Sequence, residues 1–179
     1  MYNWNWKLYI KKLKDEKIRP VLEEAVLLSK PGLALDIGAG ALNETKYLLE
    51  RGFKVIAIDP NSEDDDVLKI PIQEYIFPTN TFSLVCALLV FPFLPKKDIP
   101  DIMRGVANSL KKNGIIVAHF FGSNDTWSNR CATHSSDEIR SLIDDTGLTI
   151  IKLTEQQYDK KTAKGILKHW HVFTLIAKK

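Results

Sequence analysis

The sequence predicts an α/β fold: a seven-stranded sheet, mostly parallel, with an antiparallel hairpin at its C-terminal end and helices on both faces. Three observations support this prediction. Apolar strand-like runs alternate with helical segments through most of the chain, a pattern typical of parallel sheets. A glycine turn connects the first of these runs to a helix, and the last two runs have no helical segment between them.

Composition and charge are those of an ordinary soluble globular protein. The chain has 179 residues, of which 45% are hydrophobic and 26% charged, and its net charge is +3. This length is enough for one hydrophobic core, so we expect a single domain over residues 1–179. The basic residues do not form one concentrated patch, which disfavours a nucleic-acid partner.

We expect no membrane-embedded or secreted segment. The longest apolar run, Leu84–Leu94, contains Pro92 and is shorter than the roughly 20 residues of a membrane-spanning helix. Residues 1–12 are polar and aromatic, unlike a secretion signal. Cys86 and Cys131 are too few for a disulfide framework, which fits a cytoplasmic protein. These features leave the oligomeric state open.

Residues 1–30 are interpreted as an N-terminal helical cap or lid. Apolar residues recur there at intervals of three and four, and Pro20 is suited to the first turn of a second helix. Trp4, Trp6 and Tyr9 form an aromatic cluster ahead of the sheet. Such a cluster either packs in the core or covers a ligand.

The next stretch has the arrangement of a nucleotide-binding unit. Its elements are a strand (33–37), a glycine turn (38–40), a helix (43–50), a second strand (54–58) and an acid, Asp59. Glycines let the backbone approach a ligand closely, and an acid after the second strand can accept hydrogen bonds from ribose hydroxyls. The first question is therefore which nucleotide is bound.

The remaining elements follow the same alternation until the end of the chain. We expect a short strand (67–72), a strong strand (82–88), a helix (98–110), a strand after the Asn113–Gly114 turn (115–121), a helix from Ser136 to Gly147, and strands at 148–153 and 169–177. The last two strands are expected to be joined by the charged stretch 154–168, which we interpret as a loop.

The glycine turn favours S-adenosylmethionine over a dinucleotide such as NAD. The dinucleotide motif requires a third glycine where this chain has Asn43, and its pyrophosphate would be repelled by a carboxylate at Asp36. S-adenosylmethionine carries no phosphate. Its ammonium group could be held by the Asp36 carboxylate, directly or through water.

These motifs resemble those of class I S-adenosylmethionine-dependent methyltransferases, which have a Rossmann-like sheet closed by a C-terminal hairpin. The resembling segments are DIGAG (36–40), Asp59, FSLVCA (82–87) and KKNGI (111–115). GAGALNETKYLLERGF (38–53), HFFGSNDTW (119–127) and KHWHVFTLIAKK (168–179) look most like small methyltransferases of the tellurite-resistance type. Two departures are Leu42, where the family often has a third glycine, and the lack of an obvious acid near the end of strand three.

The resemblance implies a cofactor site at the ends of the first, second and fourth strands. The residues that would contact S-adenosylmethionine are Asp36, Gly38, Ala39, Gly40, Asp59, Pro60, Ile72, Gln73, Leu88 and Phe91. Ile72 and Gln73 are assigned to the adenine by position.

Candidate acceptor residues come from several parts of the chain. Ligands of open α/β sheets bind beyond the carboxyl ends of the parallel strands, and the last strand, if antiparallel, begins at the same edge. We therefore expect His169 or His171 to lie near His119. The three histidines could bind an acceptor, act as a base, hold a metal or be satisfied by backbone and water; of these roles the metal is the least favoured, and no metal site is expected. The candidates are Trp6, His119, Trp127, Tyr158, His169 and His171.

The predicted function is methyl transfer from S-adenosylmethionine to a small molecule. Transfer requires the nucleophile, methyl group and sulfur to be aligned, and a base only when the acceptor arrives protonated. The sequence identifies no catalytic residue. The alternative is a cofactor-binding or scaffold protein with the same fold and no transfer activity, and a dehydrogenase ranks third.

Overall fold

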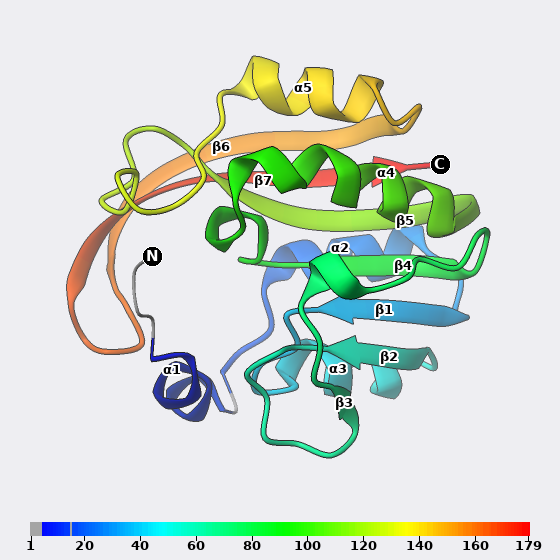
Figure 1. Ribbon diagram of the computed structural model, residues 1–179, viewed down its shortest axis with the longest axis horizontal. Coiled ribbons are helices and arrows are strands. Elements are labelled where there is room, and N and C mark those ends of the chain that lie inside the picture. Colours follow the sequence, from blue (N-terminus) through cyan, green and yellow to red (C-terminus); the bar gives the residue numbers. More distant parts are fainter. Residues whose placement is uncertain (1–4, 15) are drawn as a thin grey trace.

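The computed structural model describes residues 5–14 and 16–179, and within these residues it contains one seven-stranded sheet with the order β3-β2-β1-β4-β5-β7-β6 (Figure 1). Its strands are β1 (Leu33–Ile37), β2 (Lys54–Ile58), β3 (Val67–Leu68), β4 (Phe82–Ala87), β5 (Leu110–Phe121), β6 (Thr149–Lys161) and β7 (Leu167–Lys178). Strands β1 to β5 are parallel, and β7 runs antiparallel to both β5 and β6. The predicted fold is confirmed.

Helices cover both faces of this sheet (Figure 1). They are α1 (Trp6–Leu13), α2 (Pro20–Leu28), α3 (Asn43–Glu50), α4 (Ile99–Ser109) and α5 (Ser136–Asp144), and the short 3₁₀ turns are η1 (Ile72–Glu74), η2 (Phe91–Phe93) and η3 (Lys96–Asp98). On one face, buried residues of α4 and α5 pack against the sheet in the larger core cluster. On the other face, α2 and α3 bury Leu22, Ala25 and Leu48 in the second cluster.

The N-terminal helices match the predicted periodicity with one interruption. The first helix ends at Leu13 and the second begins with Pro20 at its first position, as expected for a residue without an N–H group. Trp4, part of the predicted aromatic cluster, lies outside the described residues. No helix in the described ranges is long and apolar enough to cross a membrane.

The last two strands are much longer than predicted. The charged stretch 154–168, interpreted as a loop, is mostly strand: Lys161 of β6 still pairs with Leu167 of β7. The prediction failed because β6 is an edge strand whose polar side chains are half-buried or exposed, whereas its backbone pairs regardless of side-chain polarity. This hairpin extends past the other strands and curves towards α1 (Figure 1).

Two smaller differences concern the third and fifth strands. The third strand is limited to Val67–Leu68; residues 69–71 are irregular, and η1 begins at Ile72, the last residue of the predicted run. The fifth strand begins at Leu110 rather than after Asn113, whose φ of 66° marks an irregularity inside the strand and not its start. Neither difference changes the strand order.

Candidate functional site

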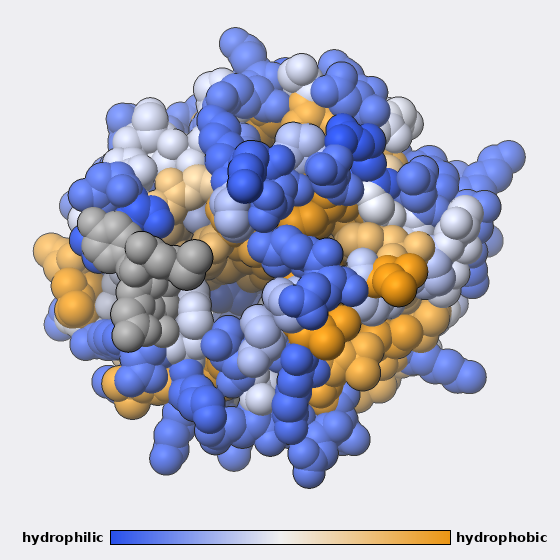
Figure 2. Space-filling view, in the orientation of Figure 1, coloured by the Kyte–Doolittle hydropathy of each residue, from blue (hydrophilic) through white to orange (hydrophobic). Residues whose placement is uncertain are grey.

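Two cavities lie at the carboxyl ends of the parallel strands. The strand-end cavity has a volume of about 250 Å³ and is bordered by α1 and by the segments after β1, β2 and β4. The hairpin cavity has a volume of about 460 Å³ and is bordered by α1, α2 and the long hairpin; its lining includes His119, Lys152, Tyr158, Lys160, Trp170 and Thr174. The face in Figure 2 is hollowed near its centre, where apolar surface is surrounded by hydrophilic side chains.

Most of the residues predicted to contact the cofactor line the strand-end cavity. They are Gly38, Ala39, Gly40, Asp59, Pro60, Ile72, Gln73 and Leu88. Of the candidate acceptor residues, Trp6 and Trp127 line the same cavity. Residues from α1, from the segments after β1, β2 and β4, and from the loop that contains Trp127 therefore meet at the strand-end cavity.

The glycine turn after β1 forms a tight backbone bend at the cavity wall. Gly38 and Gly40 have φ angles of 71° and 48°, in the left-handed region that favours glycine. A Cβ atom added to Gly38 would lie 2.6 Å from Cγ2 of Val90. The N–H groups of Gly38 and Ala39 both donate to the carbonyl of Ile58, which ties the turn to the end of β2.

Asp59 is held rigidly next to this turn. Its Oδ2 accepts a hydrogen bond of 3.0 Å from the Gly40 N–H, and its Oδ1 accepts one of 2.7 Å from the Asn61 N–H. The residue is 8% exposed. Each carboxylate oxygen has a further lone pair, so Asp59 can also accept hydrogen bonds from a ligand's hydroxyl groups.

Asp36 differs from the expectation, because it lies in the interior and not at the cavity wall. Thr45 Oγ1 donates a hydrogen bond of 2.6 Å to Asp36 Oδ2, and the residue is 2% exposed. Burial, reinforced by the nearby charge of Glu44, raises the pKa of Asp36 to about 7. The sequence pattern identifies an acid before the turn. Only the packed structure shows that this carboxyl group is buried and hydrogen-bonded to Thr45.

Asp36→Asn is expected to remove a pH-dependent loss of stability. Because the folded pKa is raised, stability from the protonated carboxyl is present below the unfolded pKa near 4 and is lost as the pH rises to about 7. Relative to the wild type, the variant should gain about 4 kcal/mol between pH 4 and pH 8, at about 1.4 kcal/mol per pKa unit. Urea unfolding at several pH values, with the exposed Asp145→Asn as control, measures this difference. An equal pH dependence in wild type and variant would contradict it.

Phe91 also lies away from the cavity wall. It is 1% exposed and stacks on Phe120, with ring centroids 5.0 Å apart. The assignment of Phe91 to the cofactor site is corrected: it is a core residue of η2. Phe93, two residues later, lines the cavity and meets Trp6 edge-on at 4.8 Å between ring centroids.

A buried ion pair supports the aromatic wall of the strand-end cavity. Lys168 Nζ hydrogen-bonds to Asp125 Oδ2 at 2.5 Å and lies 4.6 Å from the ring centroid of Phe121, 4.7 Å from that of Trp127 and 3.7 Å from that of Trp170. Burial lowers the pKa of Lys168, and the hydrogen bond with Asp125 opposes this effect. Trp127 and Trp170 line the cavity, so the pair fixes two of its walls.

Sequence reasoning did not identify Lys168 or Trp170 as site residues. The available signal was the alternation in KHWH, which places both residues on one face of β7. Arg19 was also missed. It precedes α2, lines both cavities and forms an ion pair with Glu44.

His119 lies in the wall of the hairpin cavity. It is 8% exposed, and its Nδ1 has no hydrogen-bond partner among the described residues. Burial, with a smaller contribution from the charge of Arg19, lowers its pKa to about 3. The imidazole is therefore neutral at physiological pH.

The three histidines do not converge as predicted. His119 pairs with Thr174, so the even-numbered residues of β7 share its face and His169 and His171 lie on the other. The His171 ring accepts a hydrogen bond from the Asn124 N–H and contacts Glu155 Oε1 at 2.8 Å. His169 Nδ1 is 2.7 Å from an Asp159 carboxylate oxygen.

Tyr158 lies in the hairpin cavity and stacks on Trp170, with ring centroids 6.4 Å apart. It is 42% exposed. Across residues 5–14 and 16–179, no group of three or more His, Cys, Asp or Glu side chains is placed to hold a metal ion. Of the remaining acceptor candidates, His119 and Tyr158 line the hairpin cavity, whereas His169 and His171 do not.

Comparison with known sequences finds a likeness over part of the chain. Residues 35–118, a little less than half of the chain, match the model of a methyltransferase domain. None of the curated proteins matches the sequence significantly.

Several solved structures share the fold over most of the chain. TehB from Haemophilus influenzae has a TM-score of 0.76 and 18% identity, over 97% of this chain and 67% of that one. An S-adenosylmethionine-dependent methyltransferase from Methanosarcina mazei has a TM-score of 0.70 and 16% identity, over 92% and 99%. The 1,6-didemethyltoxoflavin-N1-methyltransferase of Burkholderia thailandensis, solved with bound 1,6-didemethyltoxoflavin and S-adenosylhomocysteine, has a TM-score of 0.66 and 17% identity, over 88% of this chain and 77% of that one. These structures share the fold predicted from the sequence.

Proposed function

We propose that this chain, which has the class I methyltransferase fold and a methyltransferase domain, transfers a methyl group from S-adenosylmethionine to a small-molecule acceptor. The observation that carries the proposal is the strand-end cavity. It combines a glycine turn, in which Gly38 has no room for a Cβ atom beside Val90, with a carboxylate held by two backbone N–H groups, Asp59, and an aromatic wall.

The residues of this cavity fit the cofactor. Asp59 would accept hydrogen bonds from the ribose hydroxyls, and the bend at Gly38 and Gly40 would leave room for the amino-acid end. Ile72 and Gln73 border the region proposed for the adenine. When bound, S-adenosylmethionine supplies a methyl group on a cationic sulfur, and the aromatic ring of Trp6 would favour that charge.

The N-terminal helix is proposed to act as a lid. Trp6, Tyr9 and Leu13 of α1 line the strand-end cavity, and Tyr9 and Leu13 also line the hairpin cavity together with Ala163 of the hairpin turn. Burial raises the pKa of Tyr9. Helix and hairpin together would exclude water and orient the acceptor, which is the main requirement of an in-line transfer.

Calorimetry tests the cofactor assignment. S-adenosylmethionine and S-adenosylhomocysteine are expected to bind at one site per chain, and NAD is expected to bind much more weakly. A folded sample, verified by circular dichroism, that binds neither sulfur compound would contradict the proposal. Preference for NAD would instead favour a dehydrogenase.

A screen for turnover tests the transfer step. Formation of S-adenosylhomocysteine is measured with a panel of small phenols, thiols, amines and carboxylic acids. Turnover with any acceptor supports the enzyme. Tight cofactor binding without turnover on the whole panel would favour the alternative of a binding protein that has the fold and transfers nothing.

A further inference from the structure

We infer that the hairpin cavity is the acceptor site, and that the acceptor is a small organic anion: an acidic group attached to an aromatic or apolar body. This inference rests on the proposed methyl transfer and adds the substrate class. It is drawn from the position, charge, buried polar atoms and shape of the cavity.

The two cavities adjoin each other. Tyr9, Leu13, Arg19, Leu89 and Trp170 line both of them. A molecule in the hairpin cavity can therefore extend its nucleophilic end towards the strand-end cavity, where the methyl donor is proposed to bind.

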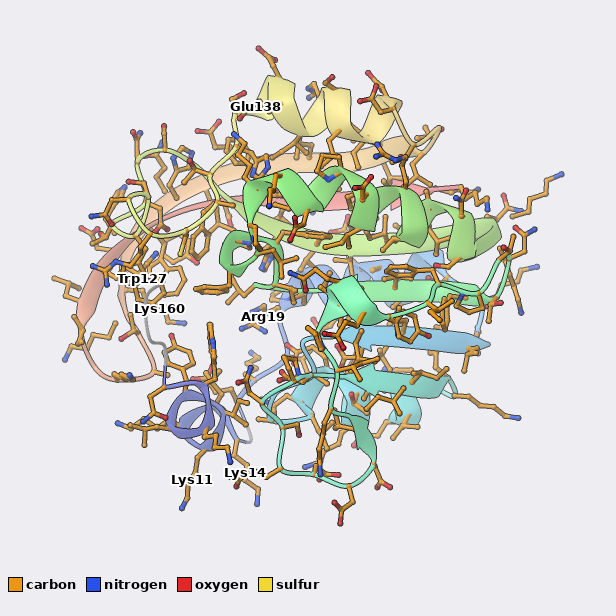
Figure 3. The ribbon with its side chains drawn as sticks, viewed as in Figure 1. Lys11, Lys14, Arg19, Trp127, Glu138 and Lys160 are labelled. Carbon is orange, nitrogen blue, oxygen red and sulfur yellow. The ribbon has the colours of Figure 1, made fainter. Side chains whose placement is uncertain are left out.

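The lining of the hairpin cavity is positively charged. Five cations, Lys17, Arg19, Lys152, Lys160 and Lys161, face two carboxylates, Glu16 and Glu24, among the described lining residues. Lys160, on the hairpin, and Arg19, ahead of α2, lie on opposite sides of the space between these elements (Figure 3).

Part of this charge is already neutralised, and part is available. Lys152 Nζ is 2.5 Å from Glu24 Oε2, and Arg19 pairs with Glu44. Within residues 5–14 and 16–179, Lys160 and Lys161 form no ion pair. A concave site with excess charge of one sign attracts ligands of the other sign, so an anionic group is favoured.

Two buried polar atoms of the same cavity lack partners. They are Nδ1 of His119 and Oγ1 of Thr162, which are 8% and 7% exposed as residues, and no described residue hydrogen-bonds to them. Leaving a buried polar group unpaired costs about 1–3 kcal/mol. A ligand with polar groups would recover this energy. Because His119 is neutral, it contributes a hydrogen bond and not a charge.

The remaining wall favours an apolar or aromatic body. Tyr158 and Trp170 stack with an interplanar angle of 15°, and Val172 and Leu89 continue the apolar surface. The volume of about 460 Å³ is within the range of sites for drug-sized molecules. The cavity is therefore larger than an inorganic anion would need.

A matched pair of dyes tests the anion preference. The anionic probe is 8-anilinonaphthalene-1-sulfonate, and N-phenyl-1-naphthylamine has the same rings without the sulfonate. The sulfonate is expected to bind saturably and at least about tenfold more tightly. Lys160→Gln/Lys161→Gln should remove most of this difference, because these lysines line the hairpin cavity and not the other one. Lys111→Gln/Lys112→Gln, exposed at the start of β5, is the control.

A substitution that fills the hairpin cavity tests whether the dyes bind there. Gln156→Trp places a large ring on the cavity-facing side of β6 and is expected to exclude both dyes. Equal affinity for the two dyes, or an unchanged preference in the Lys160/Lys161 variant, would overturn the anion assignment. Dye binding that Gln156→Trp leaves intact would overturn the location.

Two further measurements separate this inference from the proposed function. S-adenosylhomocysteine should bind the Lys160/Lys161 variant with the same affinity as it binds the wild type. If the wild type bound no S-adenosylhomocysteine, the proposed function would be refuted, whereas the anion site would still be tested by the dyes. Any acceptor found by turnover should be displaced competitively by the sulfonate dye. Turnover that saturating dye does not inhibit would show that the acceptor binds elsewhere.

Discussion

Lys168→Met is expected to lower the free energy of unfolding by about 3–5 kcal/mol. The Asp125 carboxylate, 2% exposed, would lose its charged partner and remain buried. The rings of Phe121, Trp127 and Trp170 would lose the cation that they surround. Urea unfolding near neutral pH measures the change, with the exposed Lys164→Met as control.

A double variant distinguishes a lost charge pair from a lost side chain. Asp125 also accepts hydrogen bonds from the N–H groups of Trp127 and His171. In Lys168→Met/Asp125→Asn the unpaired charge is removed and an amide oxygen can still accept one of these bonds. We expect this variant to recover at least half of the loss. A Lys168→Met variant within 1 kcal/mol of the wild type, on the order of one hydrogen bond, would contradict the role of the pair.

Asp59→Ala is expected to weaken S-adenosylhomocysteine binding by about 100-fold or more, which corresponds to almost 3 kcal/mol. The side chain does two things at once: it would accept hydrogen bonds from the ribose, and it holds the N–H groups of Gly40 and Asn61. Calorimetry measures the affinity. Asp66→Ala, in the exposed acidic loop after β2, is the control.

The same variant should also lose some stability. Two backbone N–H groups lose their acceptor, at a cost of about 1–3 kcal/mol. The sequence alone suggests an acid that serves only the ligand, whereas the structure adds this second role. Unchanged affinity in a folded Asp59→Ala sample would remove the residue from the cofactor site.

Much of the fold could be predicted because its signals are local. The apolar runs of β1 and β4 are mostly buried, that of β2 is buried at its last two residues, and Pro20 and Ser136 begin helices as expected. The hairpin was underestimated because its outer half, from Glu155 to Lys161, carries polar side chains and is held by backbone pairing with β7. Hydropathy cannot show a pairing that depends on the backbone.

The cofactor cavity was more predictable than the acceptor site. Gly38, Gly40 and Asp59 lie next to one another because one strand-turn-helix-strand unit brings them together. The histidine hypothesis depended on the register between two strands that are distant in the chain. His119 pairs with Thr174, and a shift of one residue would have reversed the face of every β7 side chain.

The sequence by itself determined the strand and helix alternation, the glycine turn and the acid that follows β2, because each depends on residues close together in the chain. Tertiary structure alone decided that Asp36 is enclosed by Thr45, that Lys168 lies among three aromatic rings, and that His119 faces a basic cavity. The physical reason is that burial and charge pairing depend on which distant segments pack together. Local patterns specify backbone geometry, whereas the environment of a side chain is set by register and packing between elements.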